Sequence, residues 1–238
     1  MNIQCAGEEL ILWPDRAVSW PRKRTLLVAD PHFGKPATFR NAGIPVPENT
    51  TAADLARLDA LLEMTSSTTL VILGDFLHAK AGRAEPTMNA LGSWCEAHRH
   101  FKIILIMGNH DLKAGQPPLC WNFEIVREAC RAGPFWFTHI PCVIPGHYVI
   151  GGHFHPAIAL RERYGAGLRA PCFCFGTQRA ILPAFGSFTG TSPVQLEGGD
   201  RRFAVGEGEV IEVQTKNPLK KFRLLPMTGK SEKNSATL

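Results

Sequence analysis

The chain has 238 residues, of which 45% are hydrophobic and 20% charged, so we expect a globular protein of about one domain with a substantial core. It has no run of 18 or more apolar residues, which argues against a transmembrane helix and a membrane partner. The net charge of +5 comes from residues 215–238, with six Lys or Arg and one Glu; residues 1–214 hold 20 basic and 20 acidic side chains, so charge alone does not indicate nucleic-acid binding.

Short apolar runs, separated by Gly and Pro, predict the strands of the first part of the chain. A hairpin is expected over residues 10–20, with its turn at Pro14-Asp15. Five central strands are expected at residues 25–29, 70–73, 103–107, 135–137 and 148–150. Helices are predicted at residues 51–64, which carry an apolar face of leucines, and at about residues 86–98, which begin with a Pro.

The second half of the chain is richer in strands. Further strands are expected at residues 171–175, 179–182, 202–205 and 210–213. The two halves together predict an α/β fold of two sheets packed face to face with helices outside. We expect this domain to occupy residues 1–214. Residues 215–238 are predicted to be a flexible basic tail, which either adds salt-dependent DNA affinity or is simply solvated.

The seven cysteines are odd in number and irregularly spaced. The first twelve residues also lack the pattern of a secretory signal, so we expect reduced thiols and a cytoplasmic protein. Cys172 and Cys174 have no partner pair at zinc-binding spacing and are expected to be buried on one strand. The aromatic residues 135–137 are expected in the core rather than as a platform for nucleic-acid bases.

Each of the five central strands is followed within three residues by His, Asp or Asn, often beside Gly. These polar residues are Asp30 and His32; Asp75; Asn109, His110 and Asp111; His139; and His153 and His155. Ligands of α/β sheets bind beyond the carboxyl ends of strands, so we expect these side chains to converge at one rim. Carboxylate, imidazole and amide groups without Cys suit manganese, iron or zinc.

Two pairs among these residues have the spacing i, i+2, which places both side chains on one side of an extended segment. They are Asp30 with His32 and His153 with His155. Seven candidate ligands are too many for one ion and fit two ions if Asp75 bridges them. Two divalent ions about 3.5–4 Å apart form a clamp for in-line displacement at phosphorus, with a metal-bound hydroxide as the nucleophile.

The order D-x-H, G-D, G-N-H-D, H and G-H-x-H resembles the calcineurin-like metallophosphoesterase superfamily. Residues 29–35 (ADPHFGK), 74–80 (GDFLHAK) and 182–189 (LPAFGSFT) are similar to the bacterial ligase-associated DNA damage response endonuclease subfamily. The likeness covers roughly residues 10–213. It implies a four-layer α-β-β-α sandwich of two mixed β-sheets flanked by helices.

The resemblance also implies a role for each polar residue. The first metal would be held by Asp30, His32 and His155, the second by Asn109, His139 and His153, and Asp75 would bridge them. His110 would be catalytic, stabilising the transition state or protonating the leaving oxygen. Asp111 would orient His110 by accepting a hydrogen bond from its ring nitrogen. Two divalent ions are implied, with Mn²⁺ favoured and iron or zinc as alternatives.

By the same resemblance the expected function is a phosphodiesterase or endonuclease acting on DNA in DNA repair, with DNA ligase and helicase as partners. A phosphomonoesterase or nucleotide pyrophosphatase with the same site is the main alternative. A protein phosphatase is disfavoured by the short chain, and a non-catalytic scaffold is disfavoured because every ligand is present. The residues do not set strand preference, endonuclease or exonuclease mode, or oligomeric state.

Four further residues have two interpretations each. His78 lies three residues after Asp75 and is expected either beside the ligands or in the core. His147 competes with His139 for the single-histidine position, but it precedes its apolar run, so His139 is favoured. Lys35 or Arg40 either contacts a substrate phosphate or belongs to a solvated loop.

Overall fold

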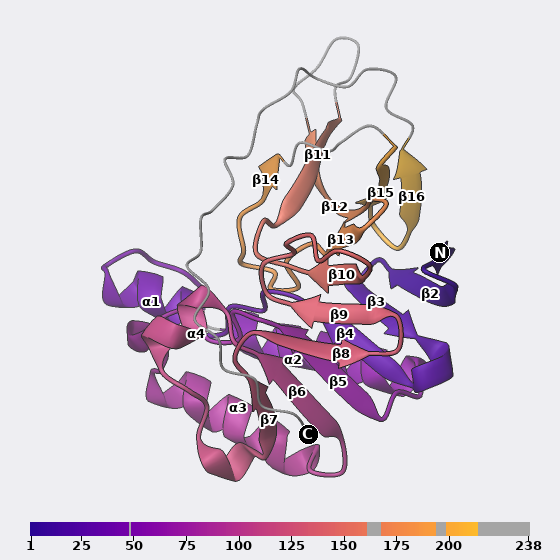
Figure 1. The fold of residues 1–238 in the computed structure, drawn as a ribbon. Helices are drawn as coiled ribbons and strands as arrows, with labels where there is room; N and C mark the ends of the chain where they lie inside the picture. Colours follow the sequence, from indigo (N-terminus) through magenta and orange to yellow (C-terminus); the bar gives the residue numbers. More distant parts are fainter. Residues whose placement is uncertain (48, 161–167, 194–198, 214–238) are drawn as a thin grey trace, which may run out of the picture.

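The structure is a computed structural model of the chain and describes residues 1–47, 49–160, 168–193 and 199–213. The prediction of a basic tail at residues 215–238 falls outside these ranges. Two β-sheets pack face to face, and helices gather on the outer side of one of them (Figure 1). The predicted two-sheet α/β sandwich of mixed sheets is therefore confirmed.

The first sheet follows the order of the chain. Its described strands are β1 (Asn2–Cys5), β2 (Glu8–Trp13), β3 (Ala17–Trp20), β4 (Thr25–Val28), β5 (Thr69–Leu73), β6 (Lys102–Ile106) and β7 (Phe123–Val126). The strands β1 to β4 pair antiparallel and include the predicted hairpin, whereas β4 to β7 pair in parallel. The carboxyl ends of β4, β5 and β6 therefore lie at one edge of the sheet.

The second sheet is formed by the later part of the chain. Its described strands are β8 (Ala129–Ala132), β9 (Phe135–Thr138), β10 (Tyr148–Gly151), β11 (Pro156–Leu160), β12 (Leu168–Phe175), β13 (Arg179–Ile181), β14 (Ser192–Pro193), β15 (Arg201–Val205) and β16 (Val210–Val213). The order is β14-β11-β12-β13-β10-β9-β8, and β15 joins β12 to β16. Because β10 is parallel to β9 and to β13, the carboxyl ends of β9 and β10 also share one edge.

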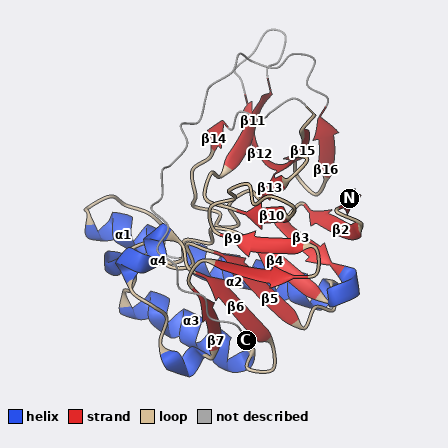
Figure 2. Ribbon diagram, in the orientation of Figure 1, coloured by secondary structure: helices blue, strands red, loops and turns tan. Residues whose placement is uncertain are grey.

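The described α-helices pack against the outer face of the first sheet (Figure 2). The helices α2 (Thr50–Met64) and α3 (Glu85–Ala97) confirm the two predicted helices and supply the crossovers that parallel strands need. The short helices α1 (Lys35–Asn41), α4 (Asn109–Ala114), η1 (Pro21–Lys23), η2 (Lys80–Gly82) and η3 (Leu119–Trp121) were not predicted. In the described ranges, the outer face of the second sheet carries no helix, so the second helical layer of the expected four-layer sandwich is not seen there.

Side chains of the first sheet enter two different cores. Along β4, Leu27 points between the sheets, whereas Leu26 and Val28 point toward the helices. Burial on both faces explains why the parallel strands are continuous apolar runs in the sequence. Fully burying one such side chain contributes roughly 1.5–3 kcal/mol, so the apolar runs fix the strands that position the polar residues beyond them. In the part of the chain that is described, the helices are all too short or too polar to span a membrane.

Candidate metal centre

All seven predicted ligands lie together at the rim where the two sheets present their strand ends. Three of the segments follow the parallel strands β4, β5 and β6, and two follow β9 and β10. The ligand residues are Asp30, His32, Asp75, Asn109, His139, His153 and His155. The parallel pairing within each sheet, and the packing of one sheet on the other, explain why residues from distant parts of the sequence meet here.

Asp30, His32 and His155 form one group, whose ligand atoms all lie within 4.8 Å of one another. His155 Nε2 is 3.7 Å from Asp30 Oδ2 and 3.3 Å from His32 Nε2. The carboxylate of Asp30 is fully buried, and its Oδ1 has no hydrogen-bond partner. A buried carboxylate is stable only with compensating charge or donors, so this group fits a cation.

Asp75, His139 and His153 form the second group, and Asn109 adjoins it. His139 Nδ1 lies 3.0 Å from the Leu73 carbonyl, which can only accept, so the ring proton sits on Nδ1. The lone pair of His139 Nε2 therefore faces the group. This nitrogen lies 3.0 Å from both His153 Nδ1 and Asn109 Oδ1, a convergence of ligand atoms that suits a metal ion.

Asp75 lies between the two groups. Its Oδ1 is 3.6 Å from His139 Nε2 and its Oδ2 is 3.7 Å from His32 Nε2. Burial, followed by the charges of nearby histidines and Lys35, lowers the pKa of His32 to about 2, so the ring is neutral and does not form an ion pair with Asp75. A neutral imidazole facing a carboxylate at this distance is the arrangement of two ligands to one cation. The two oxygens of Asp75 are thus turned toward different groups, as a bridging ligand requires.

The backbone of the centre is strained. Five of the seven ligand residues have positive φ angles, between 45° and 68°: Asp30, His32, Asp75, His153 and His155. Residues other than Gly adopt this conformation rarely, and such strain collects at functional sites. The loops also pack tightly, because a Cβ at Gly108 would lie 2.1 Å from Asp75 Oδ1.

Burial differs across the centre. Asp30 and Asp75 are 0% and 2% exposed, so the carboxylates form its floor. Asn109, His110 and the two histidines that follow β10 are half-exposed. A substrate can therefore approach from the side of His110, above the buried carboxylates.

The structure corrects the predicted role of Asp111. The ring of His110 donates from Nδ1 to the His78 carbonyl at 2.6 Å, not to Asp111. The Asp111 carboxylate instead accepts the backbone N–H groups of Leu77 and Gly108, at 2.8 and 3.0 Å. The reason is local: Asn109 begins α4, so Asp111 is the third residue of the helix and its carboxylate folds back to the Gly108 N–H group, as in a capping box.

His78 is the site residue whose place the sequence left open. Its Nδ1 lies 3.2 Å from His32 Nδ1, and its ring stacks on His110 with centroids 4.8 Å apart. Burial lowers the pKa of His78 to about 4, with His110 and Lys35 adding to the effect. The signal in the sequence was its position three residues after Asp75, in the segment that follows β5.

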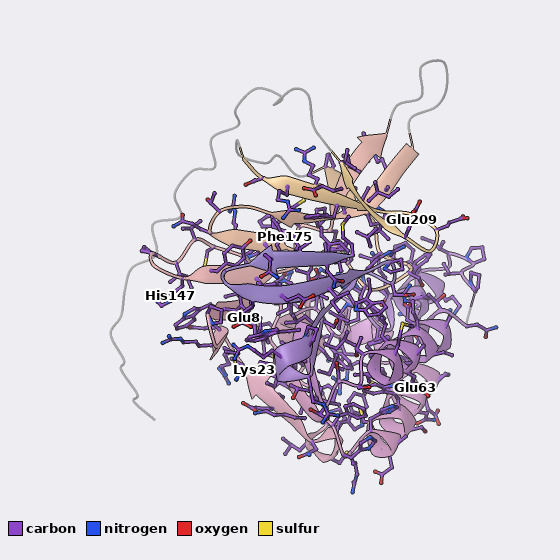
Figure 3. The ribbon with its side chains drawn as sticks, turned by 90° about the vertical axis from the view of Figure 1, so that its right-hand side faces the viewer. Glu8, Lys23, Glu63, His147, Phe175 and Glu209 are labelled. Atoms are coloured by element: carbon purple, nitrogen blue, oxygen red, sulfur yellow. The ribbon has the colours of Figure 1, made fainter. Side chains whose placement is uncertain are left out.

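The structure also settles the surroundings of His147 and Arg40, for which the sequence offered two interpretations each. His147 precedes β10 and lines a hollow of about 480 Å³ with Tyr148 and Arg201, at the end of β10 opposite the ligands. Figure 3 places it on the side of the molecule that shows Glu8 and Phe175. Arg40 donates to the carbonyls of Val46 and Pro47, both at 3.2 Å, within its own connecting segment.

Lys35 occupies the start of α1 and is half-buried, which lowers its pKa. Its charge acts on His32 and His78, which places it beside the centre. Cys172 and Cys174 are both buried on β12, as expected, with their sulfur atoms 3.7 Å apart. Phe135 and Phe137 belong to the core between the sheets.

Comparisons with known proteins show the family of this chain. The sequence pattern of the family described as calcineurin-like phosphoesterase matches residues 23–155. The crystal structure of Pseudomonas putida nuclease MPE is 39% identical, has a TM-score of 0.79, and covers 90% of this chain and 99% of that chain. Yfce, a phosphoesterase from E. coli, is 17% identical over 79% of this chain and 97% of that chain, with a TM-score of 0.40, a likeness too weak to argue from. A comparison with curated proteins finds no match.

Proposed function

This chain belongs to the calcineurin-like phosphoesterase family and is a metal-dependent phosphoric ester hydrolase, and we propose that it is a nuclease that hydrolyses phosphodiester bonds of DNA with two divalent cations. The observation that carries the proposal is the position of Asp75 between the two ligand groups, with one oxygen 3.6 Å from His139 and the other 3.7 Å from His32. A single cation would leave one of these two groups of imidazole nitrogens and carboxylate oxygens without a partner.

The two groups would each hold one cation. Asp30, His32 and His155 would bind the first, and Asn109, His139 and His153 the second, with Asp75 shared. When bound, the cations supply Lewis-acid polarisation of the phosphoryl oxygens and activation of water. Manganese is the proposed metal, and the N/O ligand set without Cys suits it.

His110 is the proposed catalytic residue. Its backbone N–H group donates to Asp75 Oδ1 at 2.8 Å and its Nδ1–H group donates to the His78 carbonyl. These two bonds fix the ring and leave Nε2 as the nitrogen that can meet the substrate. In the imidazolium form, Nε2–H stabilises negative charge on the phosphoryl group and donates its proton to the leaving oxygen.

The choice of DNA as substrate is supported by two likenesses. The solved structure that is 39% identical is described as a nuclease. Residues 29–35, 74–80 and 182–189 resemble a DNA damage response endonuclease subfamily. We extend the proposal to DNA repair, with DNA ligase and helicase as partners, on the second likeness alone.

A substrate panel with added Mn²⁺ tests the proposal. Single-stranded circular DNA, duplex DNA, a small phosphodiester and a small phosphomonoester are compared at equal phosphate concentration. We expect hydrolysis of DNA and of the diester well above that of the monoester. The variant His110→Ala should keep its bound Mn²⁺, measured by elemental analysis, and lose turnover. Hydrolysis of the monoester alone would establish the phosphomonoesterase alternative and refute the nuclease.

A further inference from the structure

Residues 182–189 contribute to the subfamily resemblance but provide none of the proposed metal ligands. The segment nevertheless lies against the first ligand loop. Ala184 forms a parallel bridge with Ala29, and the Phe185 N–H group donates to the Ala29 carbonyl at 2.7 Å. A Cβ at Gly186 would lie 2.2 Å from the Pro31 carbonyl oxygen, so the segment touches the backbone between the two ligands of that loop.

A buried ionic cluster holds this segment in place. The Asp54 carboxylate accepts the Ser187 N–H group at 3.1 and 3.2 Å and pairs with Arg57 at 3.1 Å. The Arg57 guanidinium donates to the Phe185 carbonyl and lies 4.1 Å from the centre of its ring. Buried charges of this kind fix geometry because each group needs its partner in one position. The residue that follows Ser187 is therefore presented from a rigid support.

That residue is Phe188, which is 36% exposed. Within the described ranges it is the only aromatic residue among the exposed large hydrophobic side chains. Its ring meets the half-exposed ring of Phe39 edge to face, with centroids 5.4 Å apart and planes at 90°. Such a pair at the surface is unusual, because aromatic side chains are normally used to fill the core.

The pair is connected to the metal centre through α1. Lys35 and Phe39 are four residues apart on this helix, so they share one face with their Cβ atoms about 5–6 Å apart. Lys35 forms no ion pair with any described residue. Along the chain from His32, the half-buried cation of Lys35 therefore comes first and the aromatic pair at Phe39 follows one helical turn later, the order that a phosphate followed by its base would need.

We propose that Phe39 and Phe188 form a nucleobase-binding platform, with Lys35 on the phosphate between this platform and the metal centre. The proposal rests on the proposed nuclease function and specifies its substrate as single-stranded nucleic acid. An aromatic ring stacks on any base, so the platform accepts many sequences. Bases within a duplex already stack on their neighbours, so they are less available to it.

The test compares Phe188→Ala, Phe188→Trp and the unchanged protein on three substrates with Mn²⁺. The first is an oligothymidylate, the second is an oligomer of equal length and charge built from abasic units, and the third is methyl p-nitrophenyl phosphate. Met64→Ala is the matched control, because this exposed side chain lies where α2 ends, before β5 begins and away from its ligand-bearing end. The measurement is kcat/KM on each substrate.

We expect Phe188→Ala to lower kcat/KM on the oligothymidylate, relative to the small diester, by about 5- to 150-fold, the range for removing one stacked base. Phe188→Trp should keep the ratio of kcat/KM on the oligothymidylate to kcat/KM on the small diester that the unchanged protein shows. On the abasic oligomer, kcat/KM should not depend on residue 188. An equal loss on all three substrates, or no change on the oligothymidylate, would overturn the platform and leave the nuclease in place. If the unchanged protein cleaves the diester but no nucleic acid, the nuclease proposal itself fails.

Discussion

Replacing Asp111 tests what its buried carboxylate does. The two oxygens accept the N–H groups of Leu77 and Gly108, and the side chain has no exposed surface. A buried N–H group without an acceptor costs about 1–3 kcal/mol. Asp111→Ala removes both acceptors and should lower the free energy of unfolding by about 2–6 kcal/mol. Asp111→Asn keeps one acceptor and should lose about 1–3 kcal/mol.

The assay is urea denaturation of the metal-free variants, followed by kcat of the folded protein with Mn²⁺. The ring of His110 is held by the His78 carbonyl, so kcat of Asp111→Asn should fall less than about tenfold, or about 1.4 kcal/mol. Glu63→Gln, an exposed acid-to-amide change on α2 (Figure 3), is the control. An Asp111→Asn variant as stable as the parent with kcat reduced a hundredfold or more would show that Asp111 acts on His110 directly.

Three further outcomes follow from the geometry. Asp75→Ala should lower bound Mn²⁺ from two ions per chain to one or none, and two retained ions would contradict a shared ligand. Gly108→Ala places a Cβ 2.1 Å from Asp75 Oδ1, so it should cost about 1–3 kcal/mol of stability and weaken Mn²⁺ binding in a calorimetric titration. In the metal-free protein, the folded state keeps His32 neutral while the unfolded chain protonates it below about pH 6.5. Stability should therefore fall by up to about 1.4 kcal/mol per pH unit below pH 6.5, and His32→Gln should make the dependence shallower in urea titrations between pH 5 and 7.

The sequence alone determined the five central strands and the polar residues beyond them, whereas strands such as β7 and β8 were not predicted. Apolar runs such as residues 70–73 can only be buried strands at that length, and a polar residue directly after a parallel strand must lie at the rim of the sheet. His139 and His147 could be separated on the same ground, because one follows its strand and the other precedes it. The helices α1 and α4 escaped prediction because one or two turns carry too little periodicity to detect.

Tertiary structure decided what depends on long-range contacts. The partners of Asp111 are backbone groups, which carry no sequence signal, so its bond to Leu77 could not be distinguished from a bond to the neighbouring His110. The contact between Phe39 and Phe188 joins residues that are distant in the chain and depends on the cluster around Asp54, whose members look like ordinary surface charges in the sequence. Local preference specifies which residues end a strand, whereas the packing of one sheet on the other decides which of those residues meet.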